Sequence, residues 1–270
     1  MEKEVHSKRN YLDKYLFSIR SHGRYTFTLE ELKTEFHLSS TALNQSLHRL
    51  KSKNEIAQIR KGFYAIIPPE YSQQGMLPIY FILDDLMKSL DKKYYLALLS
   101  ASALYGAAHQ QPMEFFVIVE SPAPRSIKNK KLVINFLSRK NWQEGGIIQQ
   151  KTNLGYINVS SPELTALDFF DYSDRFGINR IVSVLQELTQ EMKPTTLTKA
   201  ASRYSNTAAI QRLGYLLENV ISEKKLADSL YTVISNRSCF IVPLSPKKEK
   251  KGEIDSRWKI IKNMKVESDI

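Results

Sequence analysis

Short polar and basic side chains recur at helical spacing in residues 39–51. Asn44 and Gln45 carry amides, and His48 and Arg49 follow one turn later, while leucines fill the positions between them. An amide side chain can form two hydrogen bonds with adenine, and a guanidinium can form two with guanine. This segment therefore carries the chemistry needed to read base edges in the major groove of DNA.

Hydroxyl and basic groups flank this segment on both sides. The hydroxyls at its start can cap a helix, and the positive end of a helix attracts phosphate. Beyond it, "RKG" separates two short apolar runs and predicts a hairpin with a basic tip that can reach phosphate or the minor groove. The candidate DNA-binding residues are Ser39, Ser40, Thr41, Asn44, Gln45, His48, Arg49, Lys51, Arg60 and Lys61.

The elements that must position these residues can be predicted from the same region. Apolar spacing predicts a first helix from residue 11 to the turn at Gly23, and Thr28 with Glu31 forms a capping-box pattern that starts a second helix. A third helix follows, in which the leucines face inward, and then the hairpin. This order predicts a winged helix-turn-helix DNA-binding domain over residues 1–75.

A different reading of the same residues stays open. A polar helical face is common on helices that are only solvated, and winged helices also serve as protein-contact modules. Glu30, Glu31 and Glu35 on the predicted second helix also make the local charge modest. The ordered combination of helices and hairpin, and no single residue, favours DNA binding.

The proline-rich segment 68–78 ends this region, so we place the domain boundary at residue 75. The apolar runs at 79–91 and 94–108 predict two helices. Strand-length runs follow up to residue 160, and several helices come after Ser161. The fold class is therefore α+β, an N-terminal winged helix-turn-helix followed by a larger mixed α/β domain with a small sheet and C-terminal helices. This second domain spans residues 76–245.

Residues 246–270 form a basic C-terminal tail, in which we expect Trp258 and Ile260 to dock back onto the second domain. The chain has 270 residues and a net charge of +11, and the positive excess is spread over all three regions. This charge favours an anionic partner. With one cysteine, no apolar stretch long enough to span a membrane and a charged N-terminus, we expect a cytoplasmic protein with no membrane partner.

Catalytic patterns are weak. The histidines have no metal-ligand spacing, and neither a phosphate-binding glycine loop nor a G-x-S-x-G elbow occurs, so we expect no enzyme activity, no cofactor and no metal. Two alternatives remain. Glu114 and Glu120, with Lys130 or Lys131, suggest a metal-dependent nuclease, and the chain could instead be a module that binds a toxin directly. His109 is expected to bond helix-end carbonyls or the next loop.

Three segments of the second domain carry a family resemblance. "SALYGAAHQQP" ends at Pro112, "SSPELTALDFF" begins at Ser160, and "QRLGYLLE" begins at Gln211. In this order, after a winged helix, they resemble the AbiEi family of antitoxins from type IV toxin–antitoxin systems, over roughly residues 10 to 245. The resemblance implies a repressor that binds operator DNA of its own operon. It also implies that the second domain counters a cognate nucleotidyltransferase-like toxin.

Overall fold

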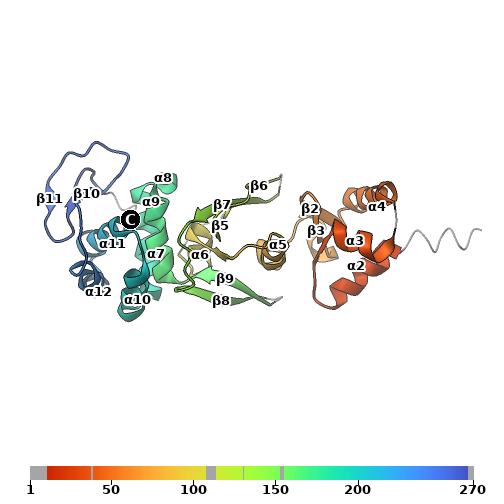
Figure 1. Cartoon of the computed structure of the whole chain (residues 1–270), viewed down its shortest axis with the longest axis horizontal. Coiled ribbons are helices and arrows are strands. Elements are labelled where there is room, and N and C mark those ends of the chain that lie inside the picture. The colour runs from red at the N-terminus through yellow and green to blue at the C-terminus, as the bar shows by residue number, and fades with distance from the viewer. Residues whose placement is uncertain (1–10, 38, 108–113, 130, 153–154, 267–270) are drawn as a thin grey trace, which may run out of the picture. The chain divides into compact units, whose positions relative to one another are not determined.

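The computed structural model describes residues 11–37, 39–107, 114–129, 131–152 and 155–266 (Figure 1). The chain divides into two compact units. The first comprises residues 1–93, 125–135 and 150–157, and the second comprises residues 94–124, 136–149 and 158–270.

The first unit begins with the elements of a winged helix-turn-helix. They are α2 (Tyr11–Ser21), β1 (Thr26–Thr28), α3 (Leu29–Phe36), α4 (Ser40–Ser52), β2 (Ile56–Arg60) and β3 (Phe63–Ile66). The strands form an antiparallel sheet in the order β1-β3-β2. This confirms the predicted winged helix.

Local signals in the sequence set the ends of these helices. The Thr28 side chain accepts from the backbone N–H of Glu31, and the Glu31 carboxylate accepts from the backbone N–H of Thr28, so the capping box is complete. His37 ends α3 in the left-handed conformation. Ser39 then caps α4, whose leucines Leu43, Leu47 and Leu50 are buried in the core of the unit.

A six-stranded mixed sheet follows, with the order β6-β7-β5-β4-β9-β8. Strand β4 pairs with β5 antiparallel and with β9 parallel. The strands are β4 (Tyr94–Leu96), β5 (Glu114–Glu120), β6 (Ile127–Lys128), β7 (Val133–Arg139), β8 (Ile147–Thr152) and β9 (Gly155–Ser160).

Most helices of the second unit come after this sheet in the chain, as predicted, and Figure 1 shows them gathered together beside the sheet. Their apolar faces form one continuous core. The helices from residue 83 onward are α5 (Leu83–Ser89), α6 (Leu98–Leu104), α7 (Pro162–Asp171), α8 (Ser173–Phe176), α9 (Ile178–Leu188), α10 (Pro194–Arg203), α11 (Thr207–Asn219) and α12 (Lys224–Ile234), and short 3-10 turns lie at Pro69–Tyr71, Ile79–Phe81 and Thr189–Glu191.

Two predicted helices are wrong in part. Residues 79–91 form a 3-10 turn and the shorter helix α5, and the run from residue 94 starts with strand β4 before α6 begins. Tyr94, Tyr95 and Leu96 are all buried in the middle of the sheet. A short apolar run of this kind fits a buried strand and a buried helix equally well, so its periodicity could not decide between them.

The boundary that we predicted at residue 75 falls inside the first unit. The Thr26 hydroxyl donates to the Asp85 carboxylate of α5 over 2.5 Å, which links β1 to a helix beyond the proline-rich segment. This polar contact joins residues 59 positions apart, so no local sequence pattern indicates it.

The C-terminal residues form a small sheet of their own in the second unit. Its strands are β10 (Val242–Pro243), β11 (Ile254–Asp255) and β12 (Ile260–Ile261), in the order β10-β12-β11. Trp258 is 1% exposed and Ile260 is fully buried, which confirms that both side chains dock back.

The "QRLGYLLE" segment of α11 is the surface that receives this C-terminal sheet. The Gln211 amide donates to the backbone oxygens of Phe240 and Trp258, both over 2.9 Å. At Gly214, a Cβ atom would lie 2.0 Å from the Trp258 ring, so only glycine leaves room for the indole. Glu218 then accepts from the indole Nε1 over 2.5 Å. The motif therefore holds the C-terminal sheet in place.

Candidate nucleic-acid interface

The outward face of α4 carries most of the predicted base-reading side chains. Asn44, Gln45 and His48 are exposed, while the leucines on the opposite face are buried. Amide and imidazole groups therefore lie on one side of a helix of 13 residues. That arrangement suits a recognition helix, which presents its exposed face to base edges.

The start of α4 is built to attract an anion. The Ser39 side chain accepts from the backbone N–H of Ala42 over 3.3 Å, so Ser39 is the cap among the three candidate hydroxyl residues. Ser39, Ser40 and Thr41 are all exposed. The first turn of a helix has backbone N–H groups without intrahelical partners and a partial positive charge, and both favour phosphate.

Two of the predicted residues are less exposed than the rest. Arg49 is half-buried, and Lys51 is half-buried with its ammonium donating to the Gln58 side-chain oxygen of β2 over 3.3 Å. This contact ties the end of α4 to the hairpin. Lys51 and the exposed Gln58 therefore lie together between helix and hairpin, and the sequence pattern did not indicate Gln58.

Arg60 and Lys61 are exposed at the tip of the β2–β3 hairpin. Arg60 pairs with Phe63, so the turn consists of Lys61 and Gly62, and Gly62 has a φ of 80° that favours glycine. The Gly62 oxygen accepts from the backbone N–H of Leu29 over 2.8 Å. The tip is thus held against the start of α3, which makes this a short and fixed wing.

The acidic residues of α3 are partly neutralised. Glu31 completes the capping box and also forms an ion pair with Arg24 over 3.0 Å. Its charge is therefore balanced within the unit, whereas Glu30 and Glu35 remain exposed on α3.

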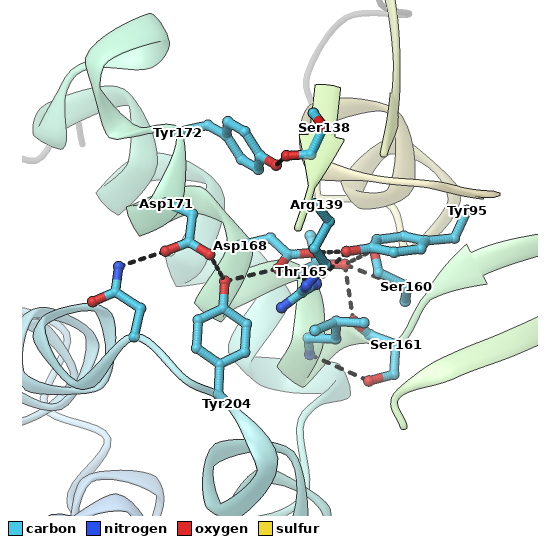
Figure 2. A network of polar contacts seen from close by, with 12 residues as sticks. Tyr95, Ser138, Arg139, Ser160, Ser161, Thr165, Asp168, Asp171, Tyr172 and Tyr204 are labelled. Atoms are coloured by element: carbon cyan, nitrogen blue, oxygen red, sulfur yellow. Dashed lines mark hydrogen bonds and ion pairs between the residues drawn. The ribbon is translucent and has the colours of Figure 1, made fainter. Parts of the chain in front are cut away.

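A network of buried polar groups occupies the second unit (Figure 2). Asp168 of α7 is fully buried, and its carboxylate accepts from Tyr95 of β4 over 2.8 Å and from Arg139 of β7 over 3.0 Å. Arg139 also donates to the Tyr95 hydroxyl and lies over the Tyr204 ring. The network therefore joins the sheet, α7 and the connection between α10 and α11.

Tyr204 links two carboxylates in this network. Its hydroxyl lies 2.9 Å from Asp168 Oδ1 and 2.5 Å from Asp171 Oδ2. A phenol carries one proton, so it can donate to only one of the two carboxylates at a time. Asp171 in turn accepts from Asn206, whose side-chain oxygen caps α11. Each of these side chains forms at least one hydrogen bond to another member of the network, which favours a structural role.

Burial raises the pKa of Asp168 to about 6 from its ordinary 3.8, although Arg139 opposes this change. Because the folded state then holds the proton more tightly than the unfolded chain does, the stabilisation by this proton is present below the ordinary pKa and is lost as the pH rises through about 6. We expect the free energy of unfolding of the wild-type protein to fall over this window relative to that of Asp168→Asn, which cannot titrate. Urea denaturation at a series of pH values measures this, and parallel curves for the two proteins would contradict it.

The carboxylates that suggested a nuclease do not share a site. Glu114 and Glu120 stand at opposite ends of β5, and six steps along a strand span about 20 Å. Among the described residues, no three His, Cys, Asp or Glu side chains gather as metal ligands would. Lys130 and His109 lie outside the described residues, so the roles predicted for them stay predictions.

Comparisons with known proteins agree with the fold. A family model described as "Transcriptional regulator, AbiEi antitoxin" matches residues 13–67, and one described as "AbiEi antitoxin C-terminal domain" matches residues 95–219. Together the two matches cover the winged helix and much of the domain that follows it. The chain therefore belongs to the AbiEi family of antitoxins, whose members are regulators.

Two solved structures are similar to the chain. The RV2827C protein from Mycobacterium tuberculosis is 17% identical, with a TM-score of 0.64 over 92% of this chain and 89% of that one, and it shows the same fold. An antigenic nucleotidyltransferase-like protein from Paracoccidioides brasiliensis is 12% identical, with a TM-score of 0.36 over 55% of this chain and 88% of that one. A search of curated proteins gave no match.

No helix in the described part of the chain is both long enough and apolar enough to cross a membrane.

Proposed function

We propose that this antitoxin represses its own operon by binding operator DNA through α4 and the β2–β3 hairpin. The observation that carries the proposal is the exposed face of α4, where Asn44, Gln45 and His48 stand together on a helix whose start is capped by Ser39. In this proposal the three side chains read base edges. Ser39, Ser40 and Thr41 hold phosphate at the start of the helix.

The basic residues around this face have a supporting role. Arg60 and Lys61 contact phosphate or the minor groove from the wing tip, where both are exposed. Arg49 and Lys51 are half-buried and contact the backbone of the DNA beside α4. Residues 1–75 would form the DNA-binding domain.

The exposed wing tip leads to a prediction about how DNA binding depends on salt concentration. Arg60→Ala and Lys61→Ala are each expected to weaken binding about equally on operator and scrambled DNA, because a phosphate contact carries no sequence information. The plot of log affinity against log salt concentration has a negative slope, and each variant should make that slope shallower by about 0.9. Fluorescence anisotropy titrations at several salt concentrations measure the slope, and two unchanged slopes would remove the wing from the interface.

We further propose that the domain beyond residue 75 counters a nucleotidyltransferase-like toxin in a type IV system. Membership of the AbiEi family and the separate core of the second unit support this division of labour. In this proposal, neutralisation of the toxin does not depend on sequence-specific DNA binding.

A growth assay tests this independence. The toxin is expressed from an unrelated promoter, so repression cannot contribute to survival, and the full chain with both Asn44→Ala and Gln45→Ala is supplied in trans. We expect it to protect cells as well as the wild type does, because both changes lie on the exposed face of α4. If the folded variant fails to protect, antitoxicity depends on DNA binding. Co-purification with the toxin would indicate direct contact.

A further inference from the structure

A groove of about 450 Å³ lies beside α2 in the first unit. Its apolar wall includes Leu16 of α2 together with Ile66, Ile67 and Pro69 from the end of the hairpin and the segment after it. Phe17 stands at the edge of this groove and is 65% exposed. The same face therefore offers both an apolar hollow and an exposed aromatic ring of a size to enter one.

Charged side chains continue this face along α2. Asp13 and Arg20 of α2 also line the groove, and the Arg20 guanidinium lies 5.8 Å from the centre of the Phe17 ring. Lys53 and Glu55 line it as well, where they form an ion pair with each other over 3.8 Å, so their charges offset each other. Residues 13, 16, 17 and 20 follow the spacing of one helical face. Along this face of α2 an acidic residue is therefore followed by two apolar residues and then by a basic one.

This pattern is complementary to itself. If two α2 helices pack antiparallel around a two-fold axis between residues 16 and 17, Asp13 of each copy faces Arg20 of the other. The same axis brings each Phe17 toward the other copy's Leu16 and the groove beside it. A two-fold contact requires such self-complementarity, because both copies use the same surface.

We propose that this face of α2 is the contact surface for a second copy of the chain. The ten candidate DNA-binding residues are absent from the lining of the groove, so α4 and the wing tip stay free for DNA. A contact built on one helix and one groove is small, and small interfaces give weak association. The dimer forms in the micromolar range.

Sedimentation velocity on the full chain without DNA tests the surface, so the result does not depend on DNA binding. Between about 1 and 100 µM we expect the wild type to pass from monomer to dimer. Phe17→Ala should raise the dissociation constant at least about tenfold, because each dimer loses two buried rings. The matched control is Phe240→Ala, which removes a ring that is 82% exposed on the second unit and should change nothing.

A charge swap tests the antiparallel geometry. Asp13→Arg and Arg20→Asp should each weaken the dimer, because each brings like charges together, and the double variant should restore it. Circular dichroism confirms that each variant is folded. A wild type that stays monomeric throughout the range would overturn the proposal, as would a dimer that survives Phe17→Ala. The proposal would also be overturned if the double variant did not dimerise as the wild type does.

Discussion

Trp258→Ala is expected to lower the free energy of unfolding of the second unit by about 3–5 kcal/mol. The indole is 1% exposed and fills the space that Gly214 leaves on α11. Its Nε1 also donates to Glu218. Alanine therefore leaves a large cavity and removes a hydrogen bond at the point where the C-terminal segment is attached. Urea denaturation followed by circular dichroism measures the loss.

Two further variants make this prediction specific. Phe240→Ala lies in the same C-terminal segment but is mostly exposed, so it should change stability by less than about 0.5 kcal/mol. Gly214→Ala should destabilise the wild type, because the added Cβ meets the indole. It should cost little in the Trp258→Ala background, where the space is free. Additive effects of the two changes would show that the ring does not occupy that space.

Asn44→Ala and Gln45→Ala are each expected to weaken binding to the operator by about 1–3 kcal/mol while leaving binding to scrambled DNA unchanged. Both side chains are exposed on α4, so neither change disturbs the core. An amide that reads a base edge contributes only on the correct sequence, whereas non-specific binding depends on phosphate contacts. The combined variant should lose most of its preference for the operator.

Arg60→Ala is the matched comparison for these amide variants, since it should weaken binding to both DNAs. Electrophoretic titrations on the two fragments at one salt concentration separate these outcomes. An equal loss on operator and scrambled DNA in the Asn44 and Gln45 variants would show that α4 does not read bases.

The winged helix could be predicted from the sequence because its signals are local. The capping box at Thr28 and Glu31, the leucines of α4 and the hairpin turn at Gly62 all lie within a few residues of the elements they specify. The same signals place Asn44 on the exposed face. They did not reveal that Lys51 bonds across to β2, because this contact depends on how helix and hairpin pack.

The polar network of the second unit escaped prediction because its members come from distant segments. Tyr95, Arg139, Asp168 and Tyr204 meet only after the sheet and helices have assembled. One signal was present in the sequence. Asp168 stands among apolar residues in the run "LTALDFF", which α7 buries, and a buried carboxylate needs partners.

The C-terminal segment shows an intermediate case. Its aromatic and apolar residues correctly indicated docking, and Trp258 and Ile260 are buried. The surface of α11 that contacts this segment could be recognised in the sequence only as the motif "QRLGYLLE", which resembles the family. The role of Gly214 could not be predicted, because it depends on the Trp258 ring, 44 residues away in the chain. A glycine inside a helix is a signal of close approach, but the sequence does not name the approaching group.

Binding of the wild-type chain to its own promoter tests the central claim most directly. At one stated salt concentration, near physiological, the full chain is titrated onto a promoter fragment and onto a scrambled fragment of equal length and composition. We predict a preference for the promoter of at least about a thousandfold, as specific DNA-binding proteins show. Equal affinity for the two fragments would contradict the assignment of α4 as a recognition helix.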